Sequence, residues 1–275
     1  MPTLREKAEQ FRALHRRGDP VILVNAWDAV SARIVEQLGF PAIATTSAGV
    51  AWLEGFADGE HISREQMLNA VKRVTQAVHV PVTADLEHGY GNSVEDGMTT
   101  ARGAIDAGAV GMNFEDWDPK AGALLDVVAQ TARIRAIATM AAQAGIPFVI
   151  NARTDVFLED VGDSDEWRIE QAVLRANAYL DAGATCAFVP GVSDEPVIAK
   201  LADAIHGPIN VLANPSTPPV ARLAQLGVAR ISVGGSAMAY ALAQFRRFAS
   251  DVKENGSFAF DAQRISHGEL NALFS

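Results

Sequence analysis

Residues 144–153, AGIPFVINAR, contain in ten positions the unit from which this chain is built. Gly145 ends a helix-period stretch, because glycine readily adopts the left-handed conformation found just after a helix. The run 148–150 is short and apolar, as strands buried on both faces of a parallel sheet are. Asn151 and Arg153 follow it directly, so the unit delivers polar side chains to the end of its predicted strand.

The same order recurs along the chain: the end of a helix, an apolar strand, and polar residues directly after the strand. Glycines precede the strands at Gly39, Gly108, Gly183 and Gly227. Eight strands alternating with helices predict a closed (β/α)8 barrel of the TIM type. An open doubly wound sheet is the alternative, but its usual phosphate-binding motifs, GxGxxG after a strand and GxxxxGK[ST], are both missing. The predicted strands are 21–24, 42–45, 80–83, 110–114, 148–150, 186–189, 209–212 and 230–233. The predicted helices between them are 30–38, 64–77, 94–107, 127–144, 167–181, 197–204 and 220–226.

Two segments lie outside this repeat. Leu4–His15 has the pattern of a helix that would cap the bottom of the barrel. Phe258–Phe274 is apolar enough to need a partner, either its own barrel or a neighbouring subunit. No linker divides the chain, so we expect one domain over residues 1–275, with the barrel at about 20–250 and a C-terminal helical extension at about 258–275.

The composition excludes several classes of protein. The 275-residue chain has a net charge of −10 and no basic stripe, which argues against a nucleic-acid partner. Its one cysteine, Cys186, excludes an internal disulfide framework and a cysteine-rich zinc site. No apolar stretch reaches the ~18 residues of a membrane span, and the N-terminus lacks a signal-peptide core. We therefore expect a cytoplasmic protein without membrane contact.

The acidic motif at residues 83–91, TADLEHGYG, follows the third predicted strand. Asp85 and Glu87 point to the same face if the chain stays extended past Ala84. Reactive residues of such barrels lie at the C-terminal ends of strands, which adds Glu115 from the fourth strand. Three carboxylates at one mouth suit a divalent cation held mostly through water, as Mg²⁺ prefers. The alternative is a solvated acidic pair in a polar loop.

Arg153, at the end of the fifth strand, faces these carboxylates. It is expected to clamp a substrate carboxylate through a bidentate pair, or alternatively to form an internal ion pair with Glu115 or Asp155. Ser47 follows the second strand and would hold a second anionic or oxo group, unless it only caps a turn. The other residues expected to contact substrate are Ala48 and Gly49, through backbone N–H groups, and Trp27, Asp28 and Asn214.

Four motifs in order along the chain resemble those of the isocitrate lyase/phosphoenolpyruvate mutase superfamily. They are FADG at 56–59, ADLEHGYG at 84–91, NFED at 113–116 and NARTD at 151–155. The resemblance implies a (β/α)8 barrel that binds Mg²⁺, with Mn²⁺ as an alternative, and a small α-oxo or α-hydroxy carboxylate that reacts through an enolate-like species. It also implies a homo-oligomer, a dimer or tetramer, whose subunits exchange a C-terminal helix.

The matching motifs imply roles for individual residues. Asp85 resembles the direct metal ligand, Arg153 the clamp on the substrate carboxylate, and Ser47 with Gly49 the grip on a substrate oxygen. The shell that holds the metal through water would be Asp58, Glu87 and Glu115. The residues expected to take part in the reaction are Asp58, Arg153 and Lys120.

The chain departs from the superfamily pattern after the fourth strand. The lyases carry a catalytic cysteine there in a Lys-x-Cys-Gly-His loop, whereas residues 116–124, DWDPKAGAL, contain none. Cys186 is predicted on the sixth strand and cannot replace it. The mutases and phosphonopyruvate hydrolases have a Lys-Thr-Asn loop, of which Lys120 remains while Gly122 stands in place of the asparagine.

These departures favour the least demanding chemistry. Loss of CO₂ from a metal-chelated β-keto acid needs mainly an electron sink and a proton source. We therefore predict a Mg²⁺-dependent lyase, most simply a decarboxylase of the oxaloacetate type. The alternatives are C–P bond chemistry, with Lys120 contacting the phosphoryl group, and a non-catalytic barrel that binds a metabolite.

Overall fold

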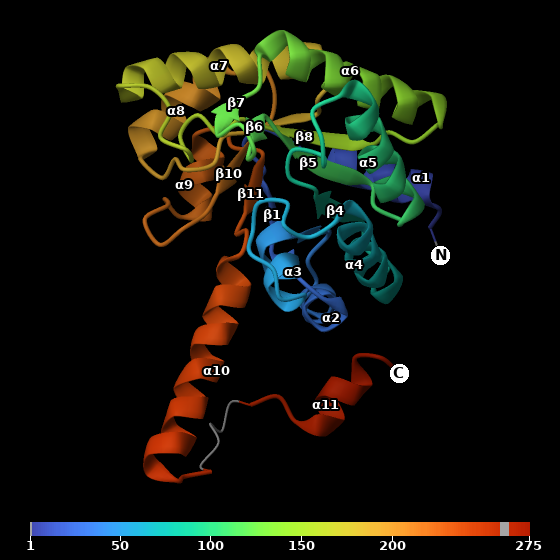
Figure 1. The fold of residues 1–275 in the computed structure, drawn as a ribbon, viewed down its shortest axis with the longest axis vertical. Helices are drawn as coiled ribbons and strands as arrows, with labels where there is room; N and C mark the ends of the chain where they lie inside the picture. Colours follow the sequence, from blue (N-terminus) through green and yellow to red (C-terminus); the bar gives the residue numbers. More distant parts are fainter. Residues whose placement is uncertain (1, 259–263) are drawn as a thin grey trace.

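The computed structural model describes residues 2–258 and 264–275. Its main sheet is parallel and has the order β1-β11-β10-β9-β8-β5-β4-β3-β2. β1 corresponds to the first predicted strand, 21–24, and β2 follows directly after it; β1 pairs with β11 and β2 with β3, so the sheet closes on itself. Helices surround it, which confirms the predicted (β/α)8 barrel (Figure 1). The strands are β1 (Val21–Leu23), β2 (Asn25–Ala26), β3 (Ile43–Thr45), β4 (Val82–Asp85), β5 (Gly111–Glu115), β8 (Val149–Arg153), β9 (Cys186–Phe188), β10 (Ile209–Leu212) and β11 (Arg230–Ser232).

A polar side chain caps the start of most of the surrounding helices, while α8 and α9 begin without a side-chain cap. Ser63 caps α4 and Ser93 caps α5, each in a reciprocal capping box. Gly145, just after α6, has the left-handed conformation that its position predicts, with a φ of 71°. Every predicted boundary of these helices lies within two residues of the observed one. These helices are α2 (Ala29–Gln37), α4 (Arg64–Ala77), α5 (Val94–Asp106), α6 (Val127–Gln143), α7 (Asp165–Asp181), α8 (Glu195–Ala204) and α9 (Val220–Gln225).

Helix α1 (Leu4–Ala13) closes the end of the barrel where the strands begin. Its residues Ala8 and Phe11 are fully buried and pack in one cluster with Val21 and Val149, which start β1 and β8. Burying an aromatic side chain of this size contributes about 1.5–3 kcal/mol. The predicted bottom cap is therefore present.

The structure differs from the sequence prediction mainly where strands end. β4 runs to Asp85 and β8 runs to Arg153, because β5 pairs with β8 as far as Glu115 opposite Arg153. The helix α3 (Ser47–Leu53) stands where a loop was expected, with Thr46 as its cap. The hairpin of β6 (Trp117–Asp118) and β7 (Ala123–Leu124) replaces the loop expected over 116–124. Both segments are too short for hydrophobic periodicity to reveal them.

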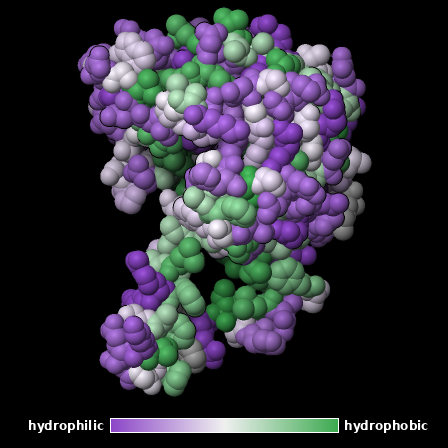
Figure 2. All heavy atoms as spheres, viewed as in Figure 1, coloured by the Kyte–Doolittle hydropathy of each residue, from purple (hydrophilic) through white to green (hydrophobic). Residues whose placement is uncertain are grey.

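Beyond the barrel, α10 (Ser236–Asn255) extends away from it, and α11 (His267–Ala272) lies beside the C-terminus (Figure 1). Tyr240 and Phe245 are 71% and 65% exposed, and Figure 2 shows hydrophobic surface gathered in this region. The predicted extension 258–274 includes residues 259–263, which lie outside the described residues. Helix exchange between subunits stays a prediction. In the described part of the chain, every helix is too short or too polar to cross a membrane.

Candidate active site

A cavity of about 140 Å³ lies at the C-terminal ends of the barrel strands, where barrels of this kind carry their reactive groups. One part of its wall is charged and contains Asp58, Asp85 and Arg153. Another part is apolar. The full lining is Asn25, Thr46, Ser47, Ala48, Asp58, Asp85, Asn113, Arg153, Leu158, Phe188, Leu212, Ser232, Gly234 and Gly235.

Asp85 ends β4, and neighbouring donors fix the orientation of its carboxylate. Its Oδ2 accepts hydrogen bonds from the backbone N–H and the hydroxyl of Ser47, at 2.9 and 2.8 Å. Its Oδ1 accepts from Nδ2 of Asn113 at 3.0 Å. From the part of the chain that the structure describes, Oδ1 accepts only this one bond and keeps a further lone pair for a cation in the cavity.

A buried arginine lies beneath this carboxylate. Oδ1 of Asn113 accepts from Nδ2 of Asn151 at 2.8 Å and from Nη2 of Arg230 at 3.2 Å, so only the amide nitrogen of Asn113 is left to face Asp85. Burial lowers the pKa of Arg230 to about 10. Sequence reasoning missed Arg230, although a basic residue at the start of an apolar strand was a visible signal.

Glu87 adds a second acidic group, but not by strand alternation. Its φ of 51° shows that the extended backbone does not continue past β4. Burial, and then the charges of Asp58 and Asp85, raise the pKa of Glu87 to about 8. Burial and the charge of Asp85 also raise the pKa of Asp58. Oε1 of Glu87 is buried without a hydrogen-bond partner, so the cluster contains both repulsion and an unsatisfied oxygen that a hard cation would relieve.

Arg153, the last residue of β8, forms ion pairs with two further carboxylates. Its Nη1 lies 2.7 Å from Oε2 of Glu115 and its Nε lies 2.6 Å from Oδ1 of Asp155. Burial lowers the pKa of Arg153, but the charges of Asp155 and Glu115 outweigh it and hold that pKa above its ordinary value. Burial raises the pKa of Glu115 well above its usual range, although Arg153 opposes the change. Arg153 is thus both ion-paired, as the alternative interpretation held, and exposed to the cavity.

Asp116 supports this arrangement from below, and sequence reasoning did not assign it a role. Its Oδ1 accepts from the backbone N–H of Asp155 at 3.1 Å. Its Oδ2 accepts from Nη1 of Arg175 at 3.0 Å and from the hydroxyl of Tyr179 at 2.6 Å. The fully buried Asp116 therefore ties β8 and its Arg153–Asp155 pair to α7. Its place in the NFED motif was the available signal.

Several predicted site residues lie away from the cavity wall. Trp27 and Asp28 line a separate apolar hollow between α2 and α10, and Asp28 caps α2. The side chain of Asn214 accepts from the N–H of Ser216 within a local turn. Lys120 is exposed on the β6–β7 hairpin. Gly49 is packed behind the cavity wall, and its backbone N–H donates to the hydroxyl oxygen of Thr46. Their assignment to substrate or reaction stays a prediction.

The donors around the cavity suit magnesium better than a softer metal. Carboxylate, hydroxyl and amide oxygens surround it, and neither a thiol nor an imidazole is among its lining residues. Within residues 2–258 and 264–275 there is no group of three His, Cys, Asp or Glu side chains placed to hold a metal together. Mg²⁺ commonly keeps several waters and one or two carboxylates, so it does not require such a group.

Comparison with known proteins gives consistent relatives. The oxaloacetate decarboxylase of Pseudomonas paraeruginosa is 31% identical, over 98% of this chain and 92% of that protein. The 2-methylisocitrate lyase of Escherichia coli is 29% identical, over 77% of this chain and 71% of that protein. A Burkholderia cenocepacia crystal structure, named only provisionally as a lyase/mutase, is 35% identical with a TM-score of 0.91, over 99% of this chain and 96% of that one.

A phosphonopyruvate hydrolase crystallised with oxalate and Mg²⁺ shares the fold, with a TM-score of 0.84 at 22% identity, over 97% of this chain and 94% of that one. The sequence model described as phosphoenolpyruvate phosphomutase matches residues 11–253, which is most of the chain. This match agrees with the motifs and with the barrel. The chain therefore belongs to the phosphoenolpyruvate phosphomutase family of enzymes, within the isocitrate lyase/phosphoenolpyruvate mutase superfamily.

Proposed function

We propose that the protein is a Mg²⁺-dependent lyase of a small α-oxo carboxylate, most simply a decarboxylase of the oxaloacetate type. The observation that carries the proposal is the meeting of Asp58, Asp85 and Arg153 around one cavity. Mutually repelling carboxylates suit a cation, and the guanidinium suits a substrate carboxylate beside it. The oxaloacetate decarboxylase relative, aligned over 98% of the chain, supports this reaction.

In this proposal Asp85 would hold the metal directly, while Asp58, Glu87 and Glu115 hold its waters. The ion would supply a Lewis acid that draws negative charge onto the oxo oxygen of the substrate. Mn²⁺ would serve in the same place. The fixed orientation of Asp85 under Ser47 and Asn113 means that this ligand needs little rearrangement on binding.

The chain's own residues would orient the substrate and exclude water. Nη1 and Nε of Arg153 face Glu115 and Asp155, so Nη2 would meet the carboxylate next to the oxo group. The carboxylate to be lost would then lie against Leu158, Phe188 and Leu212. An apolar wall disfavours a solvated carboxylate relative to neutral CO₂, so it favours breaking the bond to the β-carboxyl carbon. The electron pair of that bond moves into the C2–C3 bond while the π pair of the oxo group moves onto its oxygen, and C3 takes a proton when that pair returns.

A second candidate is cleavage of a C–P bond, which the description of the matching family favours. Lys120 would then contact the phosphoryl group. In this structure it is exposed on the β6–β7 hairpin, so the hairpin would have to bring it to the cavity. Release of phosphate from phosphonopyruvate that is lost in Lys120→Ala would favour this candidate over decarboxylation.

The test is formation of pyruvate from oxaloacetate by purified protein with Mg²⁺, measured against Mg²⁺ alone. We expect turnover above that control, and a loss of at least about a hundredfold in Asp85→Asn, because one metal ligand and its charge are removed. Asp106→Asn, the same change on the exposed face of α5, is the matched control and should keep its rate. Binding of oxaloacetate without any pyruvate above the metal control would rule the proposal out.

A further inference from the structure

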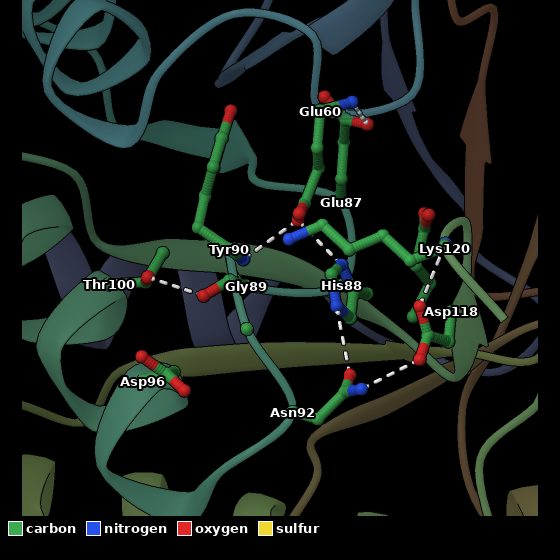
Figure 3. A network of polar contacts seen from close by, with 12 residues as sticks. Glu60, Glu87, His88, Gly89, Tyr90, Asn92, Asp96, Thr100, Asp118 and Lys120 are labelled. Atoms are coloured by element: carbon green, nitrogen blue, oxygen red, sulfur yellow. Dashed lines mark hydrogen bonds and ion pairs between the residues drawn. The ribbon is translucent and has the colours of Figure 1, made fainter.

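One chain of polar contacts joins two segments of the chain, of which the first contributes a residue to the cavity wall (Figure 3). The first is the loop of residues 54–62, which carries Asp58 and Glu60. The second is the β6–β7 hairpin, which carries Asp118 and Lys120. Between them lies the loop after β4, from which His88 reaches one segment directly and the other through Asn92.

The loop after β4 is a fixed base for these contacts. Nη2 of the fully buried Arg133 donates to the carbonyl oxygens of His88 and Gly91. The hydroxyl of Thr100 donates to the carbonyl of Gly89 at 2.8 Å. Gly89 has a φ of 95°, and a Cβ there would stand 2.6 Å from the ring of Phe114. The base is therefore packed on α5 and α6 and leaves little room for movement.

On one side, His88 holds the loop of residues 54–62. Its Nδ1 lies 2.7 Å from Oε1 of Glu60, with both side chains almost fully buried. The same oxygen accepts from the N–H of Tyr90 at 2.7 Å. The backbone N–H of Glu60 donates to Oε2 of Glu87 at 2.7 Å. Glu60 thus links this loop both to His88 and to Glu87.

On the other side, the direction of each hydrogen bond is fixed by chemistry. Oδ2 of Asp118 can only accept, so the Asn92 atom 2.6 Å away is its amide nitrogen. Oδ1 of Asn92 therefore faces Nε2 of His88 at 3.1 Å, and that nitrogen donates. Oδ1 of Asp118 accepts from the N–H groups of Lys120 and Ala121, at 2.9 and 3.2 Å, and so shapes the hairpin turn.

We propose that Glu60, His88, Asn92 and Asp118 form a latch that couples the loop of residues 54–62 to the β6–β7 hairpin, so that the two segments open and close beside the cavity together. The buried imidazole contacts the loop of residues 54–62 directly through Nδ1 and the hairpin through Asn92. If that loop leaves, Nδ1 loses its buried partner Glu60; if the hairpin leaves, Asn92 loses the partner that orients its amide oxygen toward Nε2. These four are positioning residues, because none of them lines the cavity.

The test exchanges the two polar groups of the latch. Asn92→Asp places two carboxylates against each other where an amide faced a carboxylate. Asp118→Asn leaves two amides, and as long as Nε2 of His88 donates, every orientation of the two amides turns a donor toward a donor. The double exchange, Asn92→Asp with Asp118→Asn, restores every donor–acceptor pair at the same net charge as the native protein. Asn92 is itself exposed, so these changes remove no buried packing at that position.

The measurement is hydrogen–deuterium exchange of the full chain without ligand, which does not depend on the proposed reaction. We expect amide exchange to rise about fivefold in both segments of each single variant, the equivalent of one net hydrogen bond, and to return to the native rate in the double exchange. Asn177→Asp is the matched control, because Asn177 also bridges two partners, Ala204 and His206, far from the cavity. It should leave both segments unchanged.

Two outcomes would overturn the latch. In one, Asn92→Asp speeds exchange in the hairpin alone while residues 54–62 keep the native rate, which means that the segments move independently. In the other, amide exchange in the double variant stays as fast as in the single variants. A parallel titration with oxalate and Mg²⁺ should show affinity lost in the single variants and recovered in the double exchange. If oxalate fails to bind even the native protein, the proposed function is in question, whereas the exchange result still decides the latch.

Discussion

At the scale of single residues, Arg153 illustrates what a sequence can and cannot determine. Its position after an apolar strand predicted that it would face the mouth of the barrel, and it does. The sequence left open whether it binds substrate or pairs internally, because that depends on the distances between three strands. Glu115 and Asp155 both contact it. Arg230 escaped prediction for a related reason: its partner Asn113 is more than one hundred residues away in sequence.

Ser47 supplies two of the three hydrogen bonds that orient Asp85, one from its backbone and one from its hydroxyl. In Ser47→Ala only the hydroxyl bond is lost. A hydrogen bond to a charged group contributes about 1.5–3 kcal/mol, so we expect kcat/KM to fall about tenfold or more. Steady-state kinetics would measure the change in kcat/KM, with Ser250→Ala as the control because that hydroxyl donates to the exposed Glu254. An unchanged kcat/KM in Ser47→Ala would mean that the remaining donors suffice to orient Asp85.

His15 should make the folded state less stable in mild acid. Burial, and then the charge of Arg230, lower its pKa to about 3, whereas its ordinary value is 6.5. Between these values the unfolded chain binds a proton that the folded chain does not, so stability is lost as pH falls below 6.5. The loss from this residue between pH 6.5 and 4.5 is about 2 kcal/mol.

Urea unfolding at several pH values would isolate this contribution by comparing the native chain with His15→Gln. Carboxyl groups with raised pKa values, such as Glu87 and Asp155, act in the opposite direction, but they are common to both chains. The difference in unfolding free energy between the two chains should therefore shrink toward acid pH. A constant difference would contradict a neutral, buried His15.

At the scale of elements, the predictable part of the fold is the part with a periodic pattern. The helix predicted over residues 64–77 matches α4 at both ends, since Ser63 marks its start. The short α3 and the β6–β7 hairpin were missed because they are too short to show a hydrophobic period and their shape follows from tertiary contacts. Glu87 was placed correctly near Asp85 for the wrong geometric reason, because its positive φ ends the strand pattern.

The packing of α7 against β8 depends on Asp116, which gives a prediction at this scale. Asp116→Asn would leave the buried guanidinium of Arg175 without its charge partner. Breaking a buried pair in this way costs about 3–5 kcal/mol, so the melting temperature should fall by roughly 6–20 °C. Tyr179→Phe removes only one of the donors to Asp116 and should cost about 1 kcal/mol. Calorimetry of the two variants compares them, and equal losses would argue against the ion pair as the cause.

At the scale of the whole molecule, the barrel completes its core without α10 and α11. The buried clusters consist of residues from α1 to β11, whereas α10 contributes one buried residue, Met238, near its start. A 20-residue helix with exposed aromatic residues is not stable in water on its own account. The superfamily resemblance offers a partner for this surface, namely another copy of the chain.

We therefore expect the full chain to be a dimer or tetramer held together through α10 and the segment that follows it. Phe245→Glu places a charge on a side chain that is 65% exposed in the single subunit, and it should dissociate the assembly because a charge buried without a partner is strongly unfavourable. Gln244→Glu adds the same charge at the neighbouring exposed position and is the matched control. Light scattering after size-exclusion chromatography would measure the mass of each variant. A native chain that stays monomeric at micromolar concentration would contradict the expectation, and so would a Phe245→Glu variant that keeps the native mass, because the apolar face of α10 would then not be the contact surface.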